Sequence, residues 1–237
     1  MNIESLMAKS GAYVVSERRR YQQNLPERPC LTKPAVTISY QVGAGASAIA
    51  SGLAEALQET EERGCGTWEV FDQKLIDKAL QQGRWPRKLA GIITEEKRFF
   101  VDEFMDDLFK LRPPSWVLMP EVIEATMNLA MTGHAILVGH GATIVTAKLP
   151  NVFHVRLTGS LSRRIERVRR NRSLTGEEAE KFVRTGDHKR EKYLKAHFHA
   201  RMNNELLHDL AINTDRLPET DAVAIIAEAA RRFFSRL

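Results

Sequence analysis

The sequence predicts an α/β fold in which a parallel sheet has helices packed on both faces. Short apolar runs typical of buried strands recur along the chain, and segments with helical periodicity separate them. A glycine-rich segment also lies between the first strand pattern and the first helix pattern. Because strands and helices alternate, we expect crossover connections and therefore parallel strands.

The elements follow from this alternation. Five segments have the apolar character of buried strands: 36–39, 68–71, 135–138, 152–157 and 209–213. Helical patterns occupy 48–62, 73–81, 87–110, 115–131, 160–171, 176–185, 187–207 and 219–236. Residues 1–34 are polar and contain several prolines, so we expect an N-terminal arm there and a single domain over 35–237.

Composition is that of a water-soluble globular protein. The 237 residues are 43% apolar and 27% charged, and no apolar run approaches the length of a membrane helix or a signal-peptide core. We therefore expect a cytoplasmic protein with no membrane partner. Cys30 and Cys65 belong to no metal-binding pattern, and reduced thiols are the default expectation. The sequence does not indicate an oligomeric state.

The net charge of +5 is unevenly distributed. Residues 156–201 contain fourteen Lys and Arg against six Asp and Glu. Such a block indicates an anionic partner, which is either the phosphates of a small ligand or a nucleic acid. The alternative is that these residues form a solvated helix face with no partner. Nucleic-acid binding is the least favoured of these, because aromatic residues are not interleaved with the basic ones and no recognition motif is present.

The segment from Thr37 to Ser47 has the context of a phosphate-binding loop. A glycine loop that enters a helix offers main-chain N–H groups and the positive end of the helix dipole to an anion. When the Walker pattern G-x-x-x-x-G-K-[ST] is aligned on Gly45, its hydroxyl position is occupied by Ser47. The position of the first glycine is occupied by Tyr40, however, and that of the lysine by Ala46. A tight turn that needs glycine for backbone reasons alone is the competing interpretation.

Other polar residues follow the predicted strands. Asp72, His140, Asn213 and Thr214 each come after a strand, where ligands of parallel α/β sheets bind. Asp72 is also a plausible N-cap for the helix that follows it. His140, between two glycines, is a candidate for a pocket residue.

Taken in order, these motifs resemble the cytidylate kinase-like family, a branch of the P-loop nucleoside monophosphate kinases. The likeness runs from about Val36 to Ala229 and rests on the glycine loop, on the segments around Asp72 and His140, on the arginine-rich helices, and on the segment that ends at Thr214. It implies a five-stranded parallel sheet with an arginine-bearing helical lid at about 160–200. It also implies transfer of a phosphoryl group from ATP, carried with Mg²⁺, to a nucleotide substrate.

The resemblance also implies roles for individual residues. Binding of the donor nucleotide falls to Gly43, Ala44, Gly45, Ala46 and Ser47, with Asn213 and Thr214 near the adenine. Ser47 is in addition the expected magnesium ligand. Asp72, His140 and Arg184 are the expected acceptor-binding residues.

The resemblance implies four catalytic residues in the lid: Arg190 would meet the transferring phosphoryl group, Asp187 would support the site, and Arg163 and Arg167 would fold over the donor. Asp187 and Arg190 match a D-x-x-R element, although i, i+3 pairing on a helix surface is the alternative. Arg163 and Arg167 share a helix face, whereas Arg164 lies about 100° around the helix. We therefore expect one or two of these three arginines to reach a ligand.

Two departures from the family pattern affect the predicted function. Ala46 replaces the loop lysine, and His140 stands where the family has an arginine that holds the acceptor phosphate. The alternative to a phosphotransferase is therefore a catalytically impaired protein of the same fold that binds a nucleotide or another phosphate ligand.

Overall fold

The computed structural model describes residues 33–61, 65–72, 119–139, 141–198 and 204–237. Within these residues, five parallel strands form one sheet in the order β2-β3-β1-β4-β5. The predicted fold class is confirmed.

The strands are β1 (Ala35–Tyr40), β2 (Glu69–Asp72), β3 (Ala135–Val138), β4 (Val152–Thr158) and β5 (Leu210–Asn213). The helices are α2 (Ala46–Gln58), α6 (Met119–Thr132), α7 (Ala142–Val145), α8 (Leu161–Arg172), α9 (Gly176–Phe198) and α10 (Glu219–Phe234), with a short 3₁₀ helix η1 (Glu205–Leu207) before β5.

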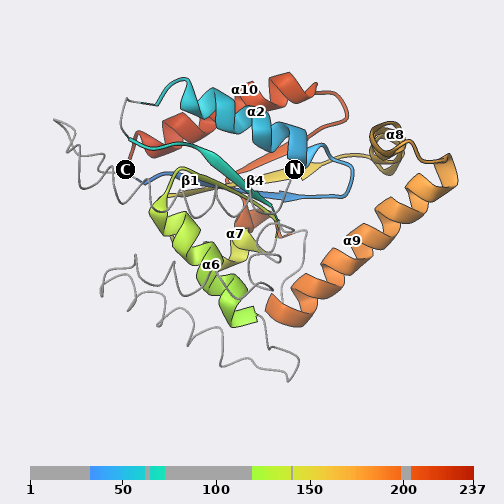
Figure 1. Cartoon of the computed structure of the whole chain (residues 1–237), viewed down its shortest axis with the longest axis horizontal. Coiled ribbons are helices and arrows are strands. Elements are labelled where there is room, and N and C mark those ends of the chain that lie inside the picture. Colours follow the sequence, from blue (N-terminus) through green and yellow to red (C-terminus); the bar gives the residue numbers. More distant parts are fainter. Residues whose placement is uncertain (1–32, 62–64, 73–118, 140, 199–203) are drawn as a thin grey trace, which may run out of the picture.

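Helices cover both faces of this sheet (Figure 1). Helices α2 and α10 pack together on one face, where their apolar side chains meet those of Val36, Ile38 and Val155. Helices α6 and α7 lie on the other face, over a second core that includes Ala35 and Leu137. Helices α8 and α9 extend to one side of the sheet and pack against each other.

A third, small apolar cluster joins this helix pair to the glycine loop. Val42 of the loop packs against Val168 of α8 and against Ala179 and Val183 of α9. Helices α8 and α9, which occupy the predicted lid region, therefore rest directly on the segment that connects β1 to α2.

The close contact between lid and loop explains one difference from the predicted elements. We expected two helices, 176–185 and 187–207, but the structure has one continuous helix, α9. A Cβ atom at Gly186 would lie 2.8 Å from a methyl carbon of Val42, so this glycine provides room for the loop and does not end the helix.

Some expectations concern residues outside the described part. These are the helices at 73–81 and 87–110, His140, and nearly all of the arm at 1–34. The expected reduced thiols need a correction, because Cys65 is disulfide-bonded. No helix among the described residues is both long enough and apolar enough to cross a bilayer.

Candidate functional site

The glycine loop has a backbone that only glycine readily adopts. Gly43 and Gly45 have φ angles of +85° and +84°, in the left-handed region. A Cβ atom at Gly43 would also lie 2.6 Å from the carbonyl oxygen of Arg164. Gly45 is the N-cap of α2, so the loop leads directly to a helix N-terminus. Both glycines are thus explained by local backbone geometry, and Gly43 in addition by its contact with α8.

Main-chain N–H groups of this loop remain available for a ligand. The N–H of Ala44 donates to the carbonyl of Gln41 at 3.0 Å and closes the turn. Within the described residues, no acceptor lies within hydrogen-bond distance of the N–H groups of Gly43, Gly45, Ala46 or Ser47. Converging N–H groups at the positive end of a helix dipole can bind an anion.

Arg164 and Asp187 hold the loop from the lid side. Asp187 Oδ1 accepts a hydrogen bond from the Val42 N–H at 2.8 Å, and Arg164 donates to the Val42 carbonyl at 3.0 Å. The two side chains also form an ion pair at 2.6 Å, and Arg164 is only 5% exposed. Both polar main-chain groups of Val42 are therefore bound by one charged pair.

Arg167 makes a second connection. It donates to the carbonyl of Gly43 at 2.6 Å and to the carbonyl of Thr214 at 3.0 Å, which links the loop to the end of β5. Its guanidinium also lies 3.6 Å from the carboxylate of Glu219, at the start of α10. Arg164 and Arg167 thus contact the carbonyl side of the loop.

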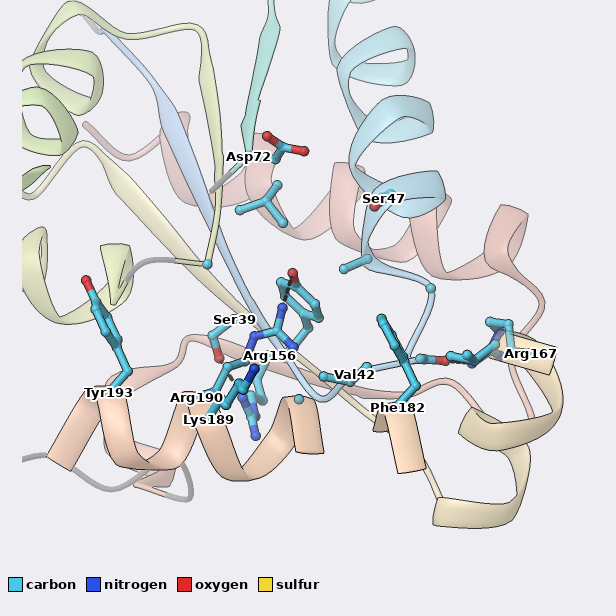
Figure 2. A pocket seen from close by; sticks show the side chains of 18 of the residues that line it. Ser39, Val42, Ser47, Asp72, Arg156, Arg167, Phe182, Lys189, Arg190 and Tyr193 are labelled. Carbon is cyan, nitrogen blue, oxygen red and sulfur yellow. Dashed lines mark hydrogen bonds between the residues drawn. The ribbon is translucent and has the colours of Figure 1, made fainter. Parts of the chain in front are cut away.

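A cavity of about 1330 Å³ opens between the loop, the strand ends and the lid (Figure 2). Basic residues dominate its charged lining: Arg156, Arg167, Arg172, Lys181, Lys189 and Arg190. The acidic lining residues among those described are Asp72, Glu178 and Glu219. The volume and the excess of positive charge fit a ligand of nucleotide size that carries phosphates.

Polar side chains continue along the central strands, on the face toward α7. Thr37 of β1 is fully buried, and its hydroxyl contacts Thr143 at 3.1 Å and His154 Nδ1 at 2.8 Å. Burial lowers the pKa of His154, although the nearby carboxylate of Asp209 opposes the effect. This stripe leads toward the cavity.

At the cavity the stripe ends in a hydrogen-bonded chain. Arg156 of β4 donates to Ser39 Oγ at 3.0 Å, and Ser39 Oγ lies 2.9 Å from His208 Nε2. Ser39 Oγ thus accepts from Arg156 and shares a second hydrogen bond with the His208 ring, in which the donor depends on the tautomer of the imidazole. Burial, followed by the charge of Arg156, lowers the pKa of His208 to about 4. His208 is therefore neutral at pH 7.

Residues that the sequence singled out fall into two groups. Seven of them line the cavity: Gly43, Gly45, Ala46, Ser47, Asp72, Arg167 and Arg190. Six described ones do not: Ala44, Arg163, Arg184, Asp187, Asn213 and Thr214. No role is tested by position alone, and the assignments remain predictions.

The residues outside the cavity lining have identifiable contacts. Arg184 is exposed and pairs with Glu180 one turn away, and Arg163 is exposed on α8. Asn213 accepts from the N–H of Asp215, whereas buried Thr214 donates to the carbonyl of Thr158. Asp187 acts on the loop backbone, as described above.

The sequence reasoning missed several residues of this cavity: Ser39, Arg156, Lys189, His208 and Glu219. One signal was available for two of them. Ser39 and Arg156, like Thr37 and His154, are polar residues within largely apolar strands, at positions whose side chains face the same side of the sheet. A polar residue at such a position of a central strand must have a partner or a ligand.

The donor atoms present fit a magnesium–phosphate ligand. Ser47 and Asp72 bring oxygen atoms to the cavity wall, and Mg²⁺ in such sites takes few protein ligands besides phosphates and water. No group of three or more His, Cys, Asp or Glu arranged for a metal occurs in the part of the chain that the structure describes. Any metal here would therefore depend on the phosphates of a bound nucleotide.

A known structure shares this fold. An uncharacterized protein from Eubacterium ventriosum is 13% identical, with a TM-score of 0.61 over 87% of this chain and 100% of its own. A protein from Thermus thermophilus (15% identity, TM-score 0.45, 84% and 98% covered) and a gluconokinase from Sinorhizobium meliloti (12%, 0.41, 88% and 94%) are more distant. No curated protein matches.

The sequence match is more specific than these structural ones. The model of the cytidylate kinase-like family matches residues 35–216, which contain all five strands, the glycine loop and the lid helices. The matched region is well over half of the chain, and the resemblance stated from the motifs is confirmed. The chain belongs to the cytidylate kinase-like family.

Proposed function

We propose that this protein is a nucleotide-dependent phosphotransferase that moves the outer phosphoryl group of ATP to an acceptor, as in nucleoside monophosphate kinases. The supporting observation is the set of N–H groups at Gly43, Gly45, Ala46 and Ser47 that have no acceptor among the described residues, at the N-terminus of α2 and on the wall of a basic cavity. Membership of the cytidylate kinase-like family supports a nucleotide as substrate.

The residues of the loop bind the donor phosphates in this proposal. The N–H groups hold the phosphate oxygens, and the Ser47 hydroxyl together with the Asp72 carboxylate provides the oxygen atoms for magnesium. When bound, Mg²⁺ supplies positive charge that offsets the charge on the outer phosphates. Arg167 and the Arg164–Asp187 pair keep the loop in the required shape.

Positive charge for the reaction comes from residues other than a loop lysine. Phosphoryl transfer depends on positioning and on charge neutralisation, and Ala46 contributes no charge. Lys189 and Arg190 of α9 line the same cavity. We therefore assign to these two lid residues the role that the lysine has in a complete Walker loop.

The test is a coupled assay for ADP with purified protein, ATP, Mg²⁺ and each ribonucleoside monophosphate in turn. We expect one acceptor to stimulate ADP formation, and Ser47→Ala to reduce that rate. A matched control is Ser162→Ala, an exposed serine on α8 that does not line the cavity. If no acceptor raises the rate above that of ATP alone, the phosphotransferase proposal fails.

A second candidate is a protein that binds a nucleotide without transferring phosphate. Two observations favour it. Ala46 stands where the Walker loop has its cation, and the carboxylate of Glu219 lies beside Gly45, 2.9 Å from where a Cβ atom of that residue would be. A negative charge is therefore next to the loop. Calorimetry with ATP and Mg²⁺ would then detect binding where the assay detects no turnover. Ala46→Lys distinguishes the candidates, since a gain of turnover indicates that the missing cation alone limits the reaction.

A further inference from the structure

A buried arginine without a carboxylate partner lies at the ends of the two central strands. Arg156 is 6% exposed, and its one hydrogen bond to a described residue goes to Ser39 Oγ. No carboxylate in the described part of the chain lies within ion-pair distance of its guanidinium. Burying a charge without a counter-charge is costly. Such a residue is best explained by a ligand that supplies the missing negative charge.

The charges around Arg156 point to the same conclusion. Those that act on it are the carboxylate of Asp187 and the guanidiniums of Arg190 and Arg164. Both oxygens of Asp187 are already bound, one by the Val42 N–H and the other by Arg164. Three guanidiniums therefore share one carboxylate, which leaves an excess of two positive charges. Burial also lowers the pKa of Arg156.

Neighbouring groups fix the geometry of this cluster. Ser39 is held between Arg156 and His208, so one side of the Arg156 guanidinium has a fixed partner. The guanidinium of Arg190 lies over the ring of Tyr40, 4.1 Å from its centroid, and also donates to the Tyr40 hydroxyl. Both arginines are thus oriented before any ligand binds, which lowers the entropic cost of binding.

The cluster is separate from the amides at the start of α2. In Figure 2, Ser39, Arg156 and Arg190 lie together, whereas Ser47, in the first turn of α2, lies apart. The cavity therefore offers two places for negative charge, one made of main-chain N–H groups and one made of guanidiniums. This arrangement suits two ligands that both carry phosphate.

We propose that Arg156, oriented by Ser39 and flanked by Arg190, binds the phosphate of the phosphoryl acceptor, which is a small molecule bearing a monophosphate. The excess of two positive charges matches a phosphate monoester, which is close to a dianion at pH 7, better than it matches a singly charged carboxylate. The assignment to the acceptor rests on the proposed phosphotransferase function; the anion site itself does not.

The test compares Arg156→Gln with the wild-type chain and with Arg232→Gln, which changes an exposed arginine on α10. The probes are inorganic phosphate, each ribonucleoside 5′-monophosphate, and ATP, each added alone and followed by thermal shift and calorimetry. We expect phosphate and at least one monophosphate to bind the wild type, and Arg156→Gln to weaken that binding by about tenfold or more. ATP affinity should change by less than about threefold in both variants.

The melting temperature without ligand separates a binding role from a structural one. Removing an uncompensated buried charge should leave the melting temperature unchanged or raise it, whereas removing a structural arginine should lower it. If Arg156→Gln fails to fold, the arginine is structural and the inference is wrong. Arg156→Lys, which keeps the charge but loses the planar fork, should show an intermediate loss of phosphate binding.

Ser39 is a positioning residue, and its variants test that role. Ser39→Ala should weaken phosphate and monophosphate binding without affecting ATP, and Ser39→Thr, which retains the hydroxyl, should restore it. The inference is overturned if the wild-type protein binds neither phosphate nor any of the monophosphates. It is also overturned if Arg156→Gln binds phosphate and the monophosphates as tightly as the wild type does. Monophosphate binding that depends on Arg156, in a protein that does not bind ATP, would instead refute the proposed function and leave the anion site standing.

Discussion

The ion pair that holds the glycine loop gives a sharp prediction for Asp187→Asn. The asparagine oxygen can still accept from the Val42 N–H, but its NH₂ group faces the N–H groups of Arg164, which then lose their carboxylate. A hydrogen bond to a charged group contributes about 1.5–3 kcal/mol. Because the Asp187 side chain is 27% exposed, we expect the lower part of this range, a loss of about 2 kcal/mol.

Such a loss can be measured by thermal or urea unfolding, and corresponds to about 4–8 °C in Tm for a chain of this size. The matched control is Glu180→Gln, which breaks the exposed pair between Glu180 and Arg184 on the same helix. That pair should contribute no more than about 0.5 kcal/mol. Nucleotide affinity should fall in Asp187→Asn, because Val42 is no longer fixed, and should not change in Glu180→Gln.

A double-mutant cycle with Arg164→Met makes the test stricter. If the two residues act as a pair, the second substitution should cost much less free energy of unfolding once the first is present. Equal losses for Asp187→Asn and Glu180→Gln, or additive losses in the cycle, would refute the view that this pair holds the loop.

Two further predictions concern the loop and the histidine beside Arg156. Gly43→Ala should destabilise the protein by about 2 kcal/mol or more in urea unfolding and abolish nucleotide binding, because φ is +85° and the Arg164 carbonyl blocks the Cβ position. Gly176→Ala, at a site with open space around it, should have little effect. The pKa of His208 falls from 6.5 to about 4 on folding, so its contribution to stability is complete above pH 6.5 and is lost as the pH falls toward 4. That contribution is about 1–2 kcal/mol after solvent screening, and His208→Gln should flatten the pH profile of unfolding by this amount.

The sequence located the strands well because a central parallel strand is buried on both faces and must be apolar. The predicted and observed bounds of β1 and β3 differ by two residues or fewer. The order of the strands in the sheet could not be predicted in the same way. Strand pairing depends on where each crossover places the next strand, and the periodicity of the sequence does not contain that information. The predicted break between the helices at 176–185 and 187–207 was wrong for a similar reason, because Val42, the residue that Gly186 makes room for, is distant in sequence.

The same distinction applies to the site. The glycine loop could be predicted because positive φ angles and a helix N-terminus are local properties. The lid arginines could be located on a helix, but not their direction: Arg164 and Val168 form the buried face of α8, and Arg163 is exposed. Arg156 lay unnoticed within a strand because only the folded sheet shows that it is a buried cation beside a cavity.

The lid arginines also explain how a loop without a lysine can attract an anion. In a trans peptide the C=O and N–H bonds point in opposite directions. Arg164 binds the Val42 carbonyl from the lid side, so the N–H of the same peptide, which belongs to Gly43, must point away from the lid. That N–H is one of those with no acceptor among the described residues. Under the proposed function, the guanidinium therefore acts on the bound anion through the peptide that it orients, and Arg164 does not need to face the cavity.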